Sequence, residues 1–178
     1  SWHGCTPTDL VFPFFLFAVG NAIAFVIPKL QEEGAFIFWK KVVKRSTLIF
    51  LIGLFLNWWP FFTIEESQLI FREWVSSSNP ILGIRTLGVL QRIALAYFFS
   101  CIIVYYFNPK AIISISFILL FMYWGLSYFF GESDPYSMLG YFGTSVDKQI
   151  LGEAHMYRGE GIAFDPEGIM STIPSIAQ

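Results

Sequence analysis

One arginine stands inside a long apolar segment, where a charge is costly. Arg92 lies within the apolar run 86–107, and a charge at the centre of a membrane-spanning helix costs about 2.5 to 3.5 kcal/mol on insertion scales. Counted from the start of the run, Arg92 lies roughly 9 Å deep at 1.5 Å per residue. Its guanidinium is expected to face a cavity or a partner. The alternatives are a purely structural ion pair, or a side chain that extends back to the interface.

Three carboxylates begin apolar segments at the same boundary. Asp9 precedes the first segment, and Asp165 and Glu167 precede the last one. Since Arg92 lies near that boundary too, these charges are expected to meet at one level of a membrane. The pattern predicts that at least one of the carboxylates holds Arg92, and that together they form a polar site.

A basic cluster stands at the other end of the segments. It consists of Lys40, Lys41, Lys44 and Arg45, just before the second apolar run. Such clusters commonly fix membrane orientation or contact anionic lipid. The alternative is a phosphate-binding rim, in which the planar guanidinium of Arg45 holds a phosphate through two hydrogen bonds while the lysines add charge.

Two further polar residues are weaker indications. Gln91 either takes part in the site beside Arg92 or joins two helices through a hydrogen bond. His155 is either a substrate ligand or a solvated loop histidine. The sequence contains no GxSxG, Walker, HExxH or CxxC pattern, so hydrolase, nucleoside-triphosphatase and zinc-site functions have no support and no metal is expected.

The amino-acid composition indicates whether these charged residues belong to a soluble or a membrane protein. The 178 residues are 55% hydrophobic, 20% aromatic and only 13% charged, whereas soluble domains carry about 25% charged residues. The net charge is −2 and the basic residues cluster at segment ends, so no nucleic-acid partner is expected. The lipid bilayer is therefore the expected environment.

Four apolar segments are long enough to cross the bilayer, which takes about 20 residues. They cover residues 10–27, 46–62, 86–107 and 111–130, and a fifth begins near Ile169. The sequence predicts an all-α polytopic membrane helix bundle with four complete spans and the start of a fifth. We expect residues 1–178 to form a single transmembrane domain, truncated at both ends.

The loops predict an orientation. The connection between the first two spans and the turn at Lys110 are basic, so they are expected on the cytoplasmic side. In the connections 63–85 and 131–168 acidic residues outnumber basic ones, and these are expected on the outer or luminal side. Two short interfacial helices are predicted there, over residues 65–75 and from Thr144 or Ser145 to residue 151.

Four blocks of sequence match the motifs of a known family. The opening SWHGCTPTDLVFPFFLF, the run LGVLQRIA at 87–94 and the run DPEGIMSTIP at 165–174 resemble the first catalytic-domain motif, the third-span signature and the DPEG-type segment of the heparan-α-glucosaminide N-acetyltransferase family and its bacterial relatives. Residues 147–157 are similar to the family's outer loop. The blocks occur in the family's order and extend over nearly the whole chain.

The resemblance implies a reaction. Family members take an acetyl group from acetyl-CoA on the cytoplasmic side and transfer it to the amine of a terminal glucosamine on the outer or luminal side. It therefore implies acetyl-CoA as a cosubstrate, an amino-sugar or glycan acceptor and an integral membrane location. The family's catalytic histidine corresponds to a position two residues before Ser1, outside this chain.

The resemblance also assigns roles to the charged residues. Asp9 is expected to orient or assist the histidine, and Arg92 to stabilise developing charge or to hold Glu167. The cofactor-binding candidates are Arg45, Lys44 and Lys41. The substrate-binding candidates are Glu167, Asp165, His155 and Gln91.

A rival class stays open at this stage. A multi-span transporter of a small polar solute would also carry paired charges within a bundle, although its inverted repeats are not seen. For the acetyltransferase we favour the bacterial inner membrane, or the lysosomal membrane for a eukaryotic source. A homodimer is compatible with the sequence.

Overall fold

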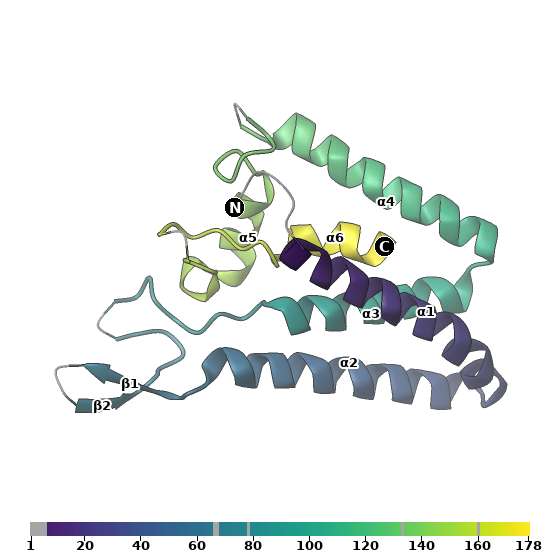
Figure 1. Ribbon diagram of the computed structural model, residues 1–178, viewed down its shortest axis with the longest axis horizontal. Coiled ribbons are helices and arrows are strands. Elements are labelled where there is room, and N and C mark those ends of the chain that lie inside the picture. Colours follow the sequence, from purple (N-terminus) through teal and green to yellow (C-terminus); the bar gives the residue numbers. More distant parts are fainter. Residues whose placement is uncertain (1–6, 66–67, 78, 133, 160) are drawn as a thin grey trace.

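The computed structural model describes residues 7–65, 68–77, 79–132, 134–159 and 161–178, apart from the side chains of residues 8, 9 and 65. Four long helices run along the molecule, and the shorter elements gather at one end of them (Figure 1). A 3-10 turn, η1 (Pro7–Leu10), leads into the first long helix. The chain is mainly helical, as predicted.

Three helices in the described part of the chain are long and apolar enough to cross a membrane. They are α1 (Val11–Glu32), α3 (Val89–Tyr106) and α4 (Pro109–Phe130). A helix of 22 residues is about 33 Å long, which matches a hydrocarbon core of about 30 Å. Within α4, which is described throughout, Ser127 is the one buried residue. Such a helix is suited to lipid or to further helices, so the chain is an integral membrane protein.

The second predicted span is wrong at both ends. Helix α2 (Ala35–Trp58) begins eleven residues earlier than the apolar run and ends four residues sooner. It starts directly after a tight turn at Gly34, whose φ of 98° is readily adopted by glycine. The basic cluster 40–45 therefore lies on the helix and not in a loop, because lysine and arginine are good helix formers that hydropathy alone does not detect.

The predicted interfacial helix over residues 65–75 is also wrong. The structure has an antiparallel hairpin of β1 (Phe62–Glu65) and β2 (Gln68–Phe71). Aromatic and β-branched residues favour strands, and over so short a segment a helical period and an alternation are hard to distinguish. Trp58 Nε1 donates to the Arg72 carbonyl oxygen at 2.9 Å, which fixes the hairpin to the end of α2.

The remaining short elements follow the predictions more closely. Helix α5 (Gly143–Leu151) forms where the second interfacial helix was predicted, although Phe142 and not a serine or threonine side chain stands at its cap. A 3-10 turn, η2 (Glu153–His155), follows it. Helix α6 (Ile169–Ala177) begins at the predicted residue.

The long helices pack through a core that α3 shares with its neighbours. The packing of α1, α2 and α3 buries one apolar cluster, made of Ile23, Ile27, Leu30, Phe38, Val42, Tyr97 and Cys101. Helix α6 packs against both α3 and α4, as Figure 1 shows for the yellow helix. The start of α6 thereby lies at the same end of the bundle as α5 and the hairpin.

The arrangement gives a topology test, because the strands β1 and β2 and the basic part of α2 lie at opposite ends of the bundle (Figure 1). Single cysteines at Ser77 and Lys40, in a protein whose native Cys5 and Cys101 are replaced, should differ in reactivity towards an impermeant maleimide. Ser77→Cys should react in intact cells, whereas Lys40→Cys should react only after permeabilisation. The reverse pattern would contradict the predicted orientation.

Candidate functional site

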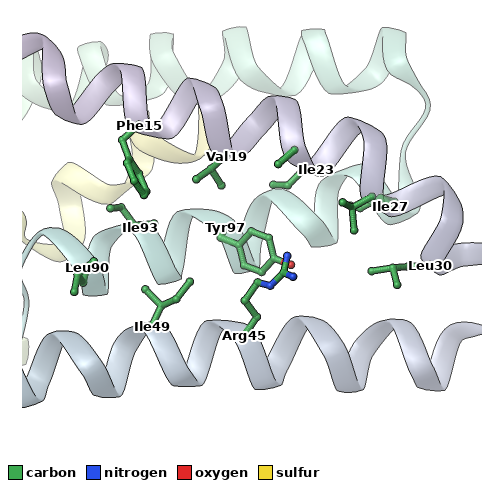
Figure 2. A pocket seen from close by; sticks show the side chains of 12 residues that line it. Phe15, Val19, Ile23, Ile27, Leu30, Arg45, Ile49, Leu90, Ile93 and Tyr97 are labelled. Atoms are coloured by element: carbon green, nitrogen blue, oxygen red, sulfur yellow. The ribbon is translucent and has the colours of Figure 1, made fainter.

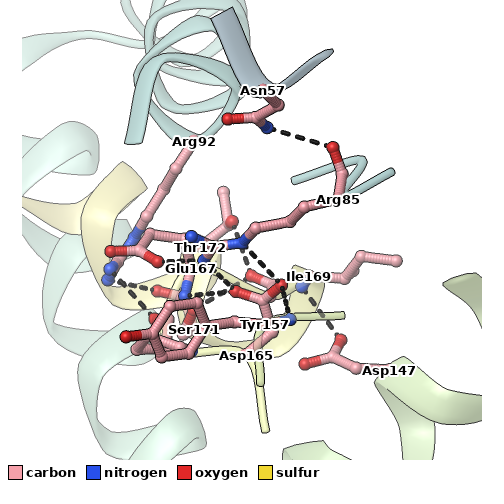
Figure 3. A network of polar contacts seen from close by, with 12 residues as sticks. Asn57, Arg85, Arg92, Asp147, Tyr157, Asp165, Glu167, Ile169, Ser171 and Thr172 are labelled. Carbon is pink, nitrogen blue, oxygen red and sulfur yellow. Dashed lines mark hydrogen bonds and ion pairs between the residues drawn. The ribbon is translucent and has the colours of Figure 1, made fainter. Parts of the chain in front are cut away.

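An ion pair between Arg85 and Asp165 lies at the centre of the polar network in Figure 3. Arg85 precedes α3 and Asp165 precedes α6, so the pair joins segments 80 residues apart. Arg85 Nε donates to Asp165 Oδ2 at 3.2 Å, and Arg85 Nη2 donates to Asp165 Oδ1 and to a carboxylate oxygen of Glu167. This forked geometry is the strong form of an arginine–carboxylate contact.

Asp165 is buried, and its charge is well satisfied. Its side chain is 0% exposed, and it also accepts the backbone N–H groups of Tyr157 and Glu167 at 3.2 and 3.1 Å. The Tyr157 ring lies 4.8 Å from the Arg85 guanidinium carbon, a cation–π distance. Burial opposes the charge on Arg85, but the two carboxylates outweigh it and raise the pKa of Arg85.

Of the three carboxylates predicted to hold Arg92, Asp165 and Glu167 form their ion pairs with Arg85 instead, and the side chain of Asp9 lies outside the described part of the structure. Arg85 takes both Asp165 and Glu167, and the hydrogen-bond partners of Arg92 among the described residues are neutral oxygens. Its contacts are Nε to Ser175 Oγ at 2.7 Å, Nη1 to the Pro166 carbonyl at 3.2 Å and Nη2 to the Ser171 carbonyl at 2.7 Å. Arg92 was expected to need a carboxylate, but these three acceptors are neutral and leave its charge unneutralised.

Arg92 also lines a cavity between α3, α4 and α6. The cavity has a volume of about 350 Å³, and its wall includes Tyr123 and Tyr141 as well as three serines. On another side the ring of Phe12, in the first turn of α1, lies 4.6 Å from the guanidinium carbon. The side chain of Asp9, the other candidate catalytic residue, lies outside the described part of the structure.

A second buried carboxylate fixes the start of α6. Asp147, on α5, is 0% exposed, and its Oδ1 accepts the backbone N–H of Ile169 at 2.9 Å. Its Oδ2 has no hydrogen-bond partner among the described residues. A Cβ on Gly168 would lie 1.9 Å from that oxygen. Burial raises the pKa of Asp147 to about 6, with a contribution from Asp165, although backbone hydrogen bonds oppose the shift.

The other two substrate-binding candidates lie beside the network. Gln91 is 1% exposed, and it packs so closely on α2 that a Cβ on Gly53 would lie 2.6 Å from its Oε1. The Nδ1 of His155 lies 2.7 Å from the Ile84 carbonyl oxygen, and its ring centroid lies 4.8 Å from that of Trp74. Neither residue lines the Arg92 cavity as described. Gln91 connects α3 to α2, and His155 connects η2 to the segment before α3.

The three cofactor-binding candidates do not share one surface. Arg45 points into an apolar cavity of about 270 Å³ between α1, α2 and α3 (Figure 2). Its guanidinium carbon lies 5.9 Å from the centroid of the Tyr97 ring. Lys41 is exposed and forms an ion pair with Glu33. Lys44 lines a different, open hollow with Trp39 and Lys40.

Sequence reasoning missed three residues of the site. Arg85 was counted only as a basic residue of an outer loop, yet its position directly before an apolar segment, like that of the carboxylates, was a usable signal. Asp147 and Tyr141 carried no such signal. Their positions depend on how α5 and the segment before it pack in the folded chain, which no local pattern encodes.

These features define an integral membrane protein, mainly helical, with a buried charge network at one end of its long helices. The chain belongs to the family described as "Domain of unknown function (DUF5009)", which matches residues 1–144.

The resemblance to heparan-α-glucosaminide N-acetyltransferases is confirmed by two relatives. The enzyme of that name from Mus musculus is 25% identical over 230 aligned residues, and the one from Homo sapiens is 24% identical over 231. The alignments include 99% of this chain and 32% of each relative. The chain therefore spans about a third of the length of the curated relatives that it matches.

The Arg85–Asp165 pair should dominate the stability of this end of the bundle. Arg85→Met leaves a buried carboxylate without its partner, which costs about 3 to 5 kcal/mol. Lys148→Met is the matched control, because its ion pair with Glu153 is exposed and worth at most about 1 kcal/mol. Thermal unfolding of the full-length protein in detergent should show a large loss for Arg85→Met alone. Equal midpoints for the two variants would contradict the role of the pair.

The raised pKa of Asp147 predicts a pH dependence. The unfolded carboxyl titrates near 3.8 and the folded one near 6, so between these values the folded protein holds a proton that the unfolded chain releases. Its contribution to stability therefore falls as the pH rises from about 4 to about 6, by on the order of 3 kcal/mol, and is constant above that.

Asp147→Asn removes this titration. Relative to the wild type, the unfolding midpoint of Asp147→Asn should rise between pH 4 and pH 6.5 and then level off. Parallel curves for the two proteins would show that Asp147 does not titrate in this range.

Proposed function

We propose that this chain is part of a single transmembrane acetyltransferase domain, which moves an acetyl group from cytoplasmic acetyl-CoA to the amine of an amino sugar on the other side. The observation that carries the proposal is that three motif blocks meet at Arg92. Phe12 comes from the first block, Arg92 from the third-span block, and the Pro166 and Ser171 carbonyls from the DPEG-type block. Support also comes from the named relatives, which match 99% of the chain.

Arg92 is suited to the transfer step. Attack of an amine on a thioester places negative charge on the carbonyl oxygen, and a fixed cationic donor stabilises that charge. Three protein oxygens hold the guanidinium in place, so little reorganisation is needed when charge develops. Phe12 brings the start of α1 beside it. The family's catalytic histidine would precede that segment, and Asp9 is proposed to orient it.

The two carboxylates receive different roles in this proposal. Asp165 is fully buried and accepts four donors, so it acts by positioning Arg85 and the segment before α6. The Glu167 side chain is 20% exposed and can accept a hydrogen bond from the sugar. His155 and Gln91 support this region from η2 and from α3, and would affect the acceptor through it.

The donor cavity is proposed to be the one that Arg45 enters. Its wall is apolar apart from Arg45 and the Tyr97 hydroxyl, a surface that suits a pantetheine chain with a phosphate at its end. Lys41 stands one helical turn from Arg45 and adds positive charge, whereas Lys44 faces another hollow. The start of α1 contacts both this cavity and Arg92, since Phe15 lines the cavity and the Phe12 ring lies beside the Arg92 guanidinium.

Acetyl-CoA binding to the full-length protein in detergent tests the proposal. Arg45→Ala should raise the dissociation constant about tenfold, the effect of losing one charge-assisted contact of about 1.5 kcal/mol. Lys44→Ala removes the same charge from the same helix but from another face, so its affinity should stay within about twofold of the wild type. A wild-type protein that binds no acetyl-CoA would favour the transporter alternative. Equal effects of the two variants on the dissociation constant would show that Arg45 contributes only its positive charge and not a specific contact.

A further inference from the structure

Tyr141 lies at the wall of the Arg92 cavity, where both its hydroxyl group and its ring are held by specific contacts. It lies in the loop between α4 and α5, and Tyr123 of α4 donates from its hydroxyl to the Tyr141 hydroxyl at 3.3 Å. The Tyr141 ring packs against that of Phe164, with centroids 5.8 Å apart. Both tyrosines line the cavity together with Arg92.

Gly143 makes this position of Tyr141 attainable. A Cβ on Gly143 would lie 2.4 Å from Cζ and 2.5 Å from the hydroxyl oxygen of Tyr141. The phenol end of the side chain therefore rests on the Gly143 backbone, and any larger residue there would displace the hydroxyl. The hydroxyl is thus fixed from two sides, by Tyr123 and by the first residue of α5.

The surroundings of Tyr141 also determine which form of the phenol is present. Burial raises the pKa of Tyr141, and the charge of Asp147 raises it further. The phenol is therefore protonated at neutral pH, so it can donate a hydrogen bond but cannot act as a base. With Tyr123 donating to its oxygen, the proton of Tyr141 stays free to be donated into the cavity.

We propose that Tyr141 is a further catalytic residue, which donates a hydrogen bond beside Arg92 to the carbonyl oxygen of the acetyl group, and that Tyr123 positions it. This inference rests on the proposed function. The amine nitrogen forms a bond to the carbonyl carbon, and the π pair moves to the oxygen between the two donors. When the pair returns, the carbon–sulfur bond breaks and the sulfur leaves with its electrons. The ammonium proton passes through the base to the thiolate, giving amide and free CoA thiol.

Kinetics of the full-length enzyme test this role. Removal of one oxyanion donor typically lowers kcat about 100- to 1,000-fold, so Tyr141→Phe should show such a loss with KM for acetyl-CoA and glucosamine within about twofold of the wild type. Tyr123→Phe should lower kcat less, about tenfold, because the Tyr141 hydroxyl stays in place but is less constrained. Tyr128→Phe is the matched control, since Tyr128 lies on the same helix, is 58% exposed and is outside the cavity wall.

The outcomes separate this inference from the proposed function. Active wild type with an equally active Tyr141→Phe would overturn the role of Tyr141 alone. Loss of kcat in Tyr141→Phe and Tyr128→Phe alike, or a loss that appears only in KM, would also overturn it, because a donor to the transition state acts on kcat. A wild type that binds no acetyl-CoA would overturn both proposals together.

Discussion

The ion pair between Arg85 and the buried Asp165 is the contact on which the rest of the site depends. Taking both charges out of water is costly, and the cost is offset only because Asp165 accepts four well-placed donors. The pair joins the segment before α3 to the segment before α6, which lie far apart in the sequence. The start of α6 is then also fixed by Asp147 from α5, so three parts of the chain converge at one end of the bundle.

The Arg85–Asp165 pair also determines which hydrogen-bond acceptors remain for Arg92. Since Arg85 takes Asp165 and Glu167, the partners of Arg92 among the described side chains are neutral oxygens from α6 and from the segment before it. A guanidinium held in this way keeps its charge available to a ligand in the cavity between α3, α4 and α6. The stabilising arginine and the proposed catalytic arginine are therefore different residues with different partners, although they stand only seven positions apart.

The features that could be predicted from the sequence are those that depend on local apolar runs and on single charged residues. The sequence predicted the helical membrane architecture, the start of α6 at Ile169, and the approach of the DPEG-type segment to the third-span block. It failed where several local patterns fit equally well, as in the hairpin over 62–71, and where a pairing partner is selected in three dimensions. Arg85 and Arg92 both lie near the carboxylates in sequence-based depth, and only the folded geometry gives both carboxylates to Arg85.

Transfer across a sealed membrane tests the central claim most directly. The full-length protein is placed in proteoliposomes that keep the two substrates in separate compartments. Labelled acetyl-CoA is on the side of the basic part of α2, and glucosamine is on the side of the hairpin. The account predicts labelled N-acetylglucosamine on the hairpin side, with no acetyl-CoA leaking across. Product that forms only when both substrates are on the same side would contradict a site that joins the two faces of the membrane.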